Sequence, residues 1–439
     1  MAGLSILLLL TFALPRAQRA AAPDVRELLV AARGVAPAIC ALAADGVGSG
    51  GWGGGWSAPV TPIGSDLRTR LRSLRKSPLS AEEGRALVAG LAAADACERH
   101  LAATLLGRAE ARSLAGDVGR RLASAVAPER AAALVALGMM EAASQAEPVG
   151  RALGDASADV RANAAWALGR MGARSSAPKI EAVLRDREPE VRAAAAVALG
   201  RLESRTSIEA LLRVLRSDES AEVRRVAAWA LGQLSDRASA EGLGTALQKD
   251  GDAEVREMAA WALAELSARD LVDTLAAALR ADQSTDVRET AAWALGELCV
   301  RKSEAGLTAA LADREPAVRA TAAWALGQLR LDHAPKALVD AIKDADDEVR
   351  LRAAWALSQI GDRQAVPAVT AALRIETQDR VRQAEIRMLL QSGDPPDDVL
   401  RGLIESKEAK TRELAVRALA GRKSPWPWPW PQPRPRPAP

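Results

Sequence analysis

Residues 221–234 read AEVRRVAAWALGQL, and closely similar segments return along most of the 439-residue chain. The shared pattern is V-R-x-x-A-A-W-A-L-G-x-L, and its first valine recurs every 31 or 32 residues. These valines are Val160, Val191, Val223, Val255, Val287, Val318, Val349 and Val381. A fixed period of this length is the signature of a protein built from stacked structural repeats.

Each repeat carries two apolar patterns. With the valine as position 0 and 100° per residue, positions 0, 4, 7, 8 and 11 fall within an arc of about 100°, which predicts one amphipathic helix. A second apolar pattern follows a short polar break, as in residues 208–215, and predicts a second, antiparallel helix. Position −3 holds residues that favour helix N-caps, and these are Ser157, Ser220, Asp252, Ser284 and Asp346.

Degenerate copies extend the array at both ends. Glu98 and Glu129 stand in the place of the valine in two earlier copies, and Thr411 stands there in a last copy. The sequence therefore predicts an all-α, right-handed α-solenoid of about eleven two-helix repeats over residues 81–422. We expect irregular capping repeats at its ends.

The repeat resembles the short HEAT-like repeats of the kind first described in phycobilisome lyases. The resemblance extends over about three quarters of the chain and implies a HEAT-type solenoid. It leaves the function open, because such repeats serve many unrelated roles.

Tryptophan recurs at position 6, and small residues recur at positions 5 and 9 on the opposite flank of the helix. The tryptophans are Trp166, Trp229, Trp261, Trp293, Trp324 and Trp355. We predict that each indole packs over the small residues of a neighbouring repeat. The alternative is an exposed aromatic ribbon that grips ligands.

Aspartate recurs at position −5 and arginine at position +1. In the centre of the array these residues are Asp218, Arg224, Asp250, Arg256, Asp282 and Arg288. Carboxylates spread one per repeat lie about 10 Å apart, whereas the ligands of a metal ion converge on one point. We therefore predict a hydrogen-bonded ladder of Asp and Arg that fixes the loops between helices.

Charge and motifs argue against several function classes. The 59 basic and 56 acidic residues are interleaved, which argues against a nucleic acid partner. His100 and His333 are the only histidines, and no pair of cysteines or histidines has zinc-site spacing. The glycines of residues 46–51 match G-x-G-x-x-G but do not open a helix. We predict no catalytic residue, metal or cofactor.

The N-terminal region is typical of an exported protein. Residues 4–14 form an apolar run of 11 residues, which is too short to span about 30 Å of bilayer and suits a secretory signal. We expect a signal peptide over residues 1–22 and an extracytoplasmic location, periplasmic or secreted, with an uncleaved anchor as the alternative. A helix over residues 23–44 and a Gly/Pro-rich linker over residues 45–80 should follow.

Three cysteines and the C-terminal tail complete the pattern. An oxidising compartment permits one disulfide, and we predict a bridge from Cys40 to Cys97 that leaves Cys299 unpaired. Residues 423–439 have proline at every second position from Pro425, which predicts a polyproline II rod. A peripheral membrane contact through its tryptophans, a peptide-binding partner and a solvated tail without function all stay open.

Together these features favour a non-enzymatic scaffold that binds a polypeptide partner on the concave face of the solenoid. We expect the second helices to line this face. The exposed positions predicted there are Arg213, Thr245, Thr308 and Asp340. Two alternatives remain, namely a lyase-type enzyme as the resemblance implies and an envelope-attached spacer that uses the tail.

Overall fold

The computed structural model describes residues 25–34, 79–107, 109–392 and 397–420. All regular secondary structure in these ranges is helical. The chain divides into two units, one ending at Leu234 and one beginning at Ser235, and each is described by itself. The signal peptide predicted over residues 1–22, the predicted linker up to residue 78, Cys40 and the tail from residue 421 lie outside the described residues, and the predictions made for them stay predictions. In the part that is described, no helix is long and apolar enough to cross a membrane.

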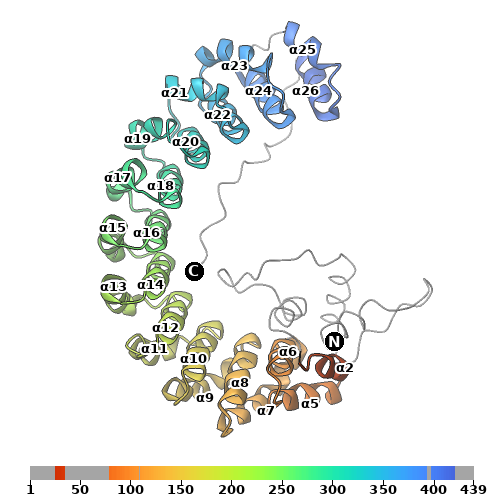
Figure 1. Cartoon of the computed structure of the whole chain (residues 1–439), viewed down its shortest axis with the longest axis vertical. Helices are drawn as coiled ribbons and strands as arrows, with labels where there is room; N and C mark the ends of the chain where they lie inside the picture. The colour runs from red at the N-terminus through yellow and green to blue at the C-terminus, as the bar shows by residue number, and fades with distance from the viewer. Residues whose placement is uncertain (1–24, 35–78, 108, 393–396, 421–439) are drawn as a thin grey trace, which may run out of the picture. The chain divides into compact units, whose positions relative to one another are not determined.

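The first unit contains a short N-terminal helix followed by paired helices (Figure 1). Their bounds are α2 Val25–Ala31, α5 Ala81–Gly90, α6 Ala96–Leu106, α7 Ala115–Arg120, α8 Ala127–Met139, α9 Ala146–Arg151, α10 Ala158–Arg170, α11 Ala177–Val183, α12 Pro189–Arg201, α13 Ile208–Ser217 and α14 Ala221–Leu234.

The second unit continues the same alternation of helices. Their bounds are α15 Ala240–Lys249, α16 Ala253–Glu265, α17 Val272–Ala281, α18 Thr285–Leu298, α19 Glu304–Ala310, α20 Pro316–Gln328, α21 Lys336–Asp340, α22 Asp347–Ile360, α23 Val366–Leu373, α24 Asp379–Ser392, α25 Asp397–Leu403 and α26 Ala409–Leu419. The prediction of an α-helical solenoid of two-helix repeats is confirmed.

The apolar stripe of each first helix forms the core of its repeat. In α18, Val287, Ala291 and Leu295 occupy positions 0, 4 and 8, and all three are 0% exposed. This stripe packs against the second helix of the preceding repeat, α17. Alanine at position 4 lets the two helices approach closely, and the large residues at positions 0 and 8 fill the space beside it.

The helix starts differ in part from the prediction. Asp252 and Asp346 cap α16 and α22 as expected, because each side chain accepts from two backbone N–H groups of its helix. Ser157 and Ser284 make no such hydrogen bond. Instead, Asp282 Oδ1 accepts from the backbone N–H of Ser284 at 2.9 Å, so the loop carboxylate fixes the turn into the helix.

The arrangement of the two rows corrects one expectation. In each unit taken by itself, the first helices (α8 to α14 and α16 to α24, even labels) lie on the inner side of a curved double row, and the second helices lie on the outer side (Figure 1). First helices pack directly on one another through alanine and glycine, whereas second helices contact each other less. Because the first helices pack more closely, their row is shorter than the row of second helices. A double row curves toward its shorter side, so the first helices lie on the inner side. The expectation that second helices line the concave face is wrong.

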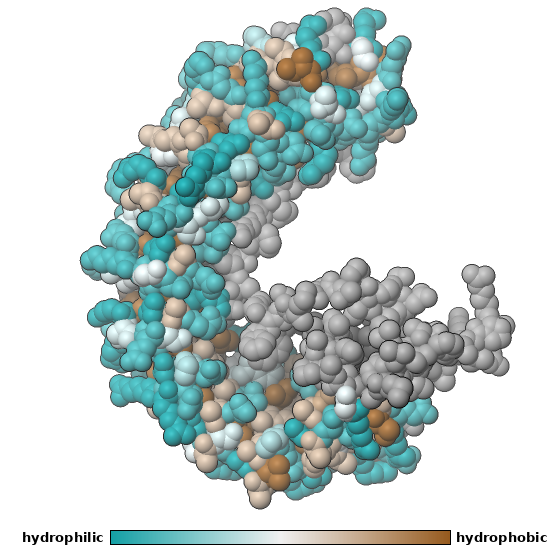
Figure 2. Space-filling view, in the orientation of Figure 1, coloured by the Kyte–Doolittle hydropathy of each residue, from teal (hydrophilic) through white to brown (hydrophobic). Residues whose placement is uncertain are grey.

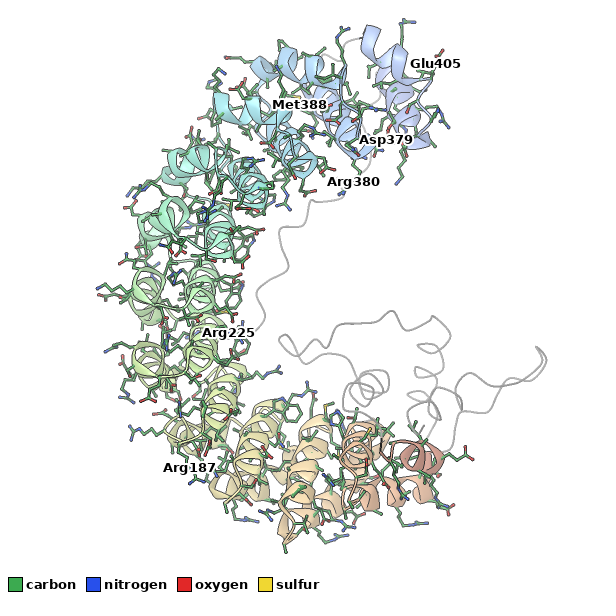
Figure 3. All side chains as sticks on the ribbon, viewed as in Figure 1. Arg187, Arg225, Asp379, Arg380, Met388 and Glu405 are labelled. Carbon is green, nitrogen blue, oxygen red and sulfur yellow. The ribbon has the colours of Figure 1, made fainter. Side chains whose placement is uncertain are left out.

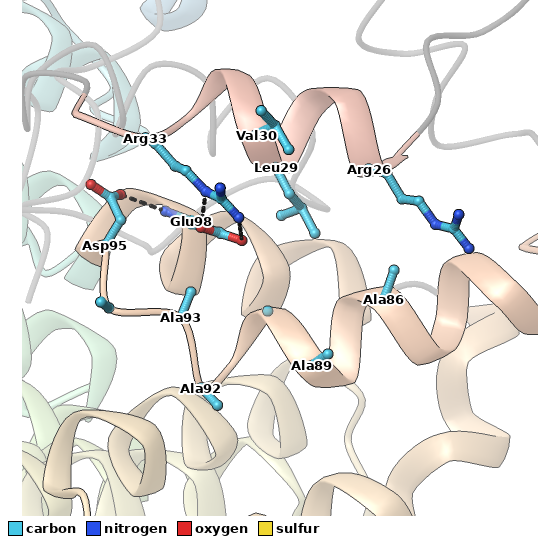
Figure 4. A pocket seen from close by; sticks show the side chains of 12 residues that line it. Arg26, Leu29, Val30, Arg33, Ala86, Ala89, Ala92, Ala93, Asp95 and Glu98 are labelled. Carbon is cyan, nitrogen blue, oxygen red and sulfur yellow. Dashed lines mark hydrogen bonds and ion pairs between the residues drawn. The ribbon is translucent and has the colours of Figure 1, made fainter.

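The N-terminal helix packs on the first pair of helices. Arg33, just after α2, donates from Nε and Nη2 to Glu98 of α6 at 2.7 and 3.2 Å, and Asp95 accepts from the N–H of Gly34 at 2.9 Å (Figure 4). Cys97, at the start of α6, is disulfide-bonded, and Cys299 is free. Since Cys40 lies outside the described residues, the pairing of Cys97 with Cys40 stays a prediction.

Candidate interaction surface

Arginines at position +1 join neighbouring repeats. Arg256 donates from Nε and Nη2 to the two carboxylate oxygens of Asp282, at 2.7 and 2.9 Å. Its Nη1 donates to the carbonyl oxygens of Asp250 and Gly251, at 2.9 and 3.2 Å. One guanidinium therefore ties the loop before its own helix to the loop of the following repeat through charge-assisted hydrogen bonds.

The same geometry recurs and confirms the ladder of Asp and Arg. The pairs are Arg130–Asp155, Arg161–Asp186, Arg192–Asp218, Arg256–Asp282, Arg288–Asp313, Arg319–Asp344 and Arg350–Glu376. Arg224 and Asp250 lie at the same positions, and Arg224 Nη1 donates to the carbonyl oxygen of Asp218 at 2.9 Å. The sequence pattern missed Arg130 and Glu376, although both stand at the ladder positions of their repeats.

The ladder side chains are shielded from solvent, and the pKa values of their carboxyl groups are shifted by their arginine partners. The side chains of Arg161 and Asp186 are only 9% and 13% exposed. The hydrogen bond from Arg161 holds the pKa of Asp186 below its ordinary value, against the opposing effect of burial. The ladder is therefore part of the structural framework, and its groups are not available to bind a ligand.

The tryptophans pack over the glycines of the preceding repeat. A Cβ atom added at Gly327 would lie 2.6 Å from Cζ3 of Trp355, and one added at Gly296 would lie 2.7 Å from Cζ3 of Trp324. Such distances are far below van der Waals contact, so only glycine leaves room for the indole. Trp355 and Trp324 are 1% and 2% exposed. Their role is packing between repeats, and the alternative of an exposed aromatic ribbon is not supported at these positions.

One tryptophan departs from this pattern for a visible reason. Trp293 is half-buried, whereas the other five tryptophans at position 6 are buried. The residue at position 9 of its preceding repeat is Ala264, and the corresponding residue is glycine for each of the other five. The additional methyl group occupies the space into which an indole packs elsewhere.

In the inner row of the second unit, the solvent-facing side of α16 and α18 is acidic. Positions −1, 2 and 10 point away from the core stripe. On α16 and α18 all six residues at these positions are acidic, namely Glu254, Glu257, Glu265, Asp286, Glu289 and Glu297. The basic residue on each of these two helices is the ladder arginine. The visible surface of the second unit is largely hydrophilic (Figure 2). A row of carboxylates on neighbouring helices attracts cationic polypeptide segments.

A second column of hydrogen bonds crosses this inner row. Thr290 donates to Glu257 Oε1 at 3.3 Å, and Thr321 donates to Glu289 Oε1 at 3.4 Å. Arg352 of α22 in turn donates to the Thr321 hydroxyl at 3.4 Å. The first two contacts join position 2 of one repeat to position 3 of the next, and the third joins position 3 of one repeat to position 3 of the next. The sequence analysis missed this column, because its residue types change from repeat to repeat.

The inner row of the first unit has a different character. Position 10 is arginine on α10 and α12, where Arg170 lies 6.0 Å from the Trp166 ring centroid and donates to Glu141 at 3.3 Å. Burial, and secondarily the charge of Arg170, lowers the pKa of Arg201. Position 2 on both helices is alanine. On the inner side of α14, Arg225 is paired with Glu222 at 2.7 Å (Figure 3).

The four positions predicted to bind a partner lie on the outer row. Arg213, Thr245 and Asp340 are exposed on α13, α15 and α21, and Thr308 is half-buried on α19. Thr245 donates to the carbonyl oxygen of Glu241 at 3.0 Å, and Asp340 pairs with Lys336 at 2.5 Å. They come from different repeats and do not form a common site on the inner side.

No chemistry-bearing cluster stands out in the described ranges. Among these residues, no three His, Cys, Asp or Glu side chains are grouped so as to hold a metal ion. His333 is an exposed loop residue 3.8 Å from Asp362. The surface features that remain are extended rows, which suit contact with a polymer more than capture of a small substrate.

Solved structures of similar shape support this fold. Importin beta matches with a TM-score of 0.60 at 13% identity, over 90% of this chain and 62% of that one. Yeast importin-beta (Kap95p) matches with a TM-score of 0.55 at 16% identity, over 88% and 63%. The chain thus spans about three fifths of the length of these importins. At such low identity the likeness concerns the fold alone. No curated protein matches the chain.

A family model for HEAT repeats matches in six overlapping segments. They cover residues 146–232, 177–264, 240–305, 272–348, 304–390 and 335–420, which together amount to more than half of the chain. The phycobilisome-lyase subtype suggested by the repeat length is not distinguished by this match. The chain belongs to the HEAT repeat family.

Proposed function

We propose that this protein is a non-enzymatic scaffold that binds a cationic segment of a partner polypeptide on the inner row of its second unit. The observation that carries the proposal is the set of six carboxylates at the solvent-facing positions of α16 and α18. Carboxylates on a rigid frame attract a cationic chain and fix its register. HEAT solenoids generally bind protein partners, and one similar structure describes Kap95p binding with RanGDP.

The rigidity of this row supports the proposal. The ladder arginines, together with the buried indoles of Trp261, Trp324 and Trp355, hold first helices against their neighbours. The spacing between solvent-facing residues is therefore set before a partner binds. A pre-organised surface loses less conformational entropy on binding. Contacts distributed over several repeats then add up along an extended partner.

We further propose an extracytoplasmic location, periplasmic or secreted. The apolar run of residues 4–14 and the disulfide-bonded state of Cys97 support it. Cell fractionation tests this location. Recovery of the whole pool in the cytoplasm with Cys97 reduced would contradict it.

Site-specific photo-crosslinking tests the proposed surface. A photoreactive amino acid at Gln328 or Gln359, at position 10 of α20 and α22, should give an adduct with one polypeptide in producing cells. The same amino acid at Arg213 or Asp340, on the outer row, serves as the matched control. Adducts confined to the outer row would contradict the proposal.

A further inference from the structure

The last described helix carries an uncovered stacking stripe. Positions 1, 5 and 9 of a first helix face the following repeat. Position 5 is alanine in seven earlier repeats, and each of these alanines is 0% exposed: Ala165, Ala196, Ala228, Ala260, Ala292, Ala323 and Ala354. On α26, position 5 is Val416, which is 51% exposed, and position 9 is Ala420, which is exposed.

Arg412 stands at position 1 of this stripe in the geometry of a ladder arginine. Its Nη1 donates to the carbonyl oxygens of Ser406 and Lys407, at 2.6 and 2.9 Å. In the same way, Arg319 Nη1 donates to the carbonyl oxygens of Asp313 and Arg314 in the loop before its own helix, at 3.0 and 3.3 Å. Its Nε and Nη2 donate to the carboxylate of Asp344 in the next repeat. Among the described residues, no carboxylate accepts a hydrogen bond from Nε and Nη2 of Arg412, the edge of the guanidinium that binds Asp344 in Arg319.

The inner junctions show what such a stripe binds. Seven ladder arginines, from Arg130 to Arg350, each bond to a carboxylate in the loop that leads into the next first helix. At the junction of α24 with α26 the arginine, Arg382, bonds instead to Asp379 of its own helix. The large side chain at position 6 of the next first helix packs on the small residue at position 9. This large side chain lies 11 residues after the carboxylate in the sequence, as Trp355 does after Asp344. The stripe on α26 therefore continues an interface that the chain forms repeatedly within itself.

We propose that the α26 stripe of Arg412, Val416 and Ala420 docks a helical hairpin of a partner protein. The hairpin supplies a carboxylate to the free edge of Arg412. A large apolar side chain of the same hairpin covers Val416 and Ala420. The array thereby continues across a boundary between two proteins.

Two other occupants match this stripe less well. Residues 421–439 contain neither Asp nor Glu, and the proline at every second position from Pro425 predicts a polyproline II rod in place of a helix. A second copy stacked head to tail would offer its N-terminal end, where Ala93 stands at the carboxylate position and Thr104 at position 6. That end is also occupied by α2, whose following Arg33 is bonded to Glu98.

A binding measurement with a defined probe tests the proposal. The probe is a labelled, helix-stapled peptide with the sequence of residues 313–329, which holds the carboxylate of Asp313 and the indole of Trp324. Fluorescence anisotropy with the full chain should show saturable binding. Arg412→Gln in the protein, or Asp313→Asn in the peptide, should weaken it at least fivefold, and the two changes together should weaken it no further. Arg417→Gln on the same helix is the matched control and should leave binding unchanged.

Three results would overturn the proposal. The first is the absence of saturable binding, or binding that Arg412→Gln leaves unchanged. The second is at least tenfold tighter binding to a chain ending at Ala420, because the tail would then be the occupant. The third is a dimer in sedimentation analysis that Val416→Glu dissociates, because the occupant would then be a second copy.

Discussion

Arg288 holds Asp313 of the following repeat with two hydrogen bonds, from Nε at 2.7 Å and from Nη2 at 2.9 Å. The Arg288 side chain is 5% exposed, and that of Asp313 is 12% exposed. The third nitrogen of the same group donates to the carbonyl oxygen of Asp282 at 3.0 Å. This one contact couples two repeats and fixes both loops, and its recurrence makes the stability of neighbouring repeats interdependent.

Removal of one ladder carboxylate should destabilise the array. Asp313→Ala leaves the Arg288 guanidinium shielded and without its partner, and we expect a loss of about 2–4 kcal/mol in the free energy of unfolding. Urea denaturation followed by circular dichroism measures it. Asp340→Ala, at an exposed site on the outer row, is the control and should change stability by less than about 0.5 kcal/mol. Equal effects of the two substitutions would contradict the structural role of the ladder.

The ladder also predicts how the stability of the folded protein changes at low pH. The pKa of Asp186 is lowered first by its hydrogen bond from Arg161. A depressed carboxyl pKa contributes stability that is present above the ordinary pKa and is lost as pH falls through the lower, folded value. Asp186→Asn should therefore flatten the decline of the melting temperature below about pH 4. An unchanged acid slope in this variant would show that Asp186 does not carry the effect.

Replacing a glycine beneath an indole should be costly. A Cβ at Gly327 would lie 2.6 Å from Trp355 Cζ3 and 2.9 Å from Cα of Ala356, so the neighbouring helix must move. We expect Gly327→Ala to lower the free energy of unfolding by about 1–3 kcal/mol. The reverse change, Ala264→Gly, should let Trp293 become less accessible to acrylamide quenching. Greater stability of Gly327→Ala would contradict the packing described for Trp355.

The buried carboxyl group of Glu385 should make the stability of the protein fall at alkaline pH. Glu385 stands at position 4 of α24, where other repeats have alanine, and it is 0% exposed with no hydrogen-bond partner for either carboxylate oxygen. Burial, and secondarily the charge of Glu376, raises its pKa from 4.5 to about 8. The folded state therefore favours the protonated acid, and stability is lost as pH rises from about 4.5 through about 8.

Glu385→Gln should remove this dependence and raise stability near pH 9 by a few kcal/mol. Urea denaturation at pH 6 and pH 9 compares the two chains, and Glu405→Gln, at an exposed site, is the control. If the unsubstituted chain is equally stable at both pH values, Glu385 is not held in a neutral form.

The disulfide prediction is tested by peptide mapping of the unreduced protein. A bridge between Cys40 and Cys97 would close a loop of about 57 residues and contribute roughly 4 kcal/mol by the chain-entropy estimate. Reduction should therefore lower the melting temperature, and Cys299→Ser should leave it unchanged. Detection of Cys40 and Cys97 as free thiols in exported protein would contradict the pairing.

The features that the sequence predicts are those that recur once per repeat. The apolar stripe, the indoles and the ladder all follow from position within the repeat, so they could be placed before any coordinates. The choice of inner row could not, because both helices of a repeat are amphipathic and the curvature depends on how closely each row packs. The small residues at positions 5 and 9 did hold that information.

Features that occur only once or twice escaped the repeat pattern. The contact of Thr290 with Glu257 depends on the register between neighbouring helices, which a period alone does not determine. Glu385 was visible as a single carboxyl at an alanine position, but its burial required the structure. The open edge of Arg412 is likewise defined only by what lies beyond α26.

The central claim is that the inner row of the second unit, through the acidic side of α16 and α18, binds a polypeptide. Its most direct test is the affinity for the polypeptide crosslinked at Gln328, measured for two matched charge-reversal variants. One variant changes Glu254, Asp286 and Glu297 to Lys on the inner row, and the other changes Glu241, Asp273 and Glu304 to Lys on the outer row. We predict that the first loses at least tenfold in affinity, with a weaker salt dependence, and that the second binds as the unsubstituted chain does. Equal affinity of the two variants would contradict the account.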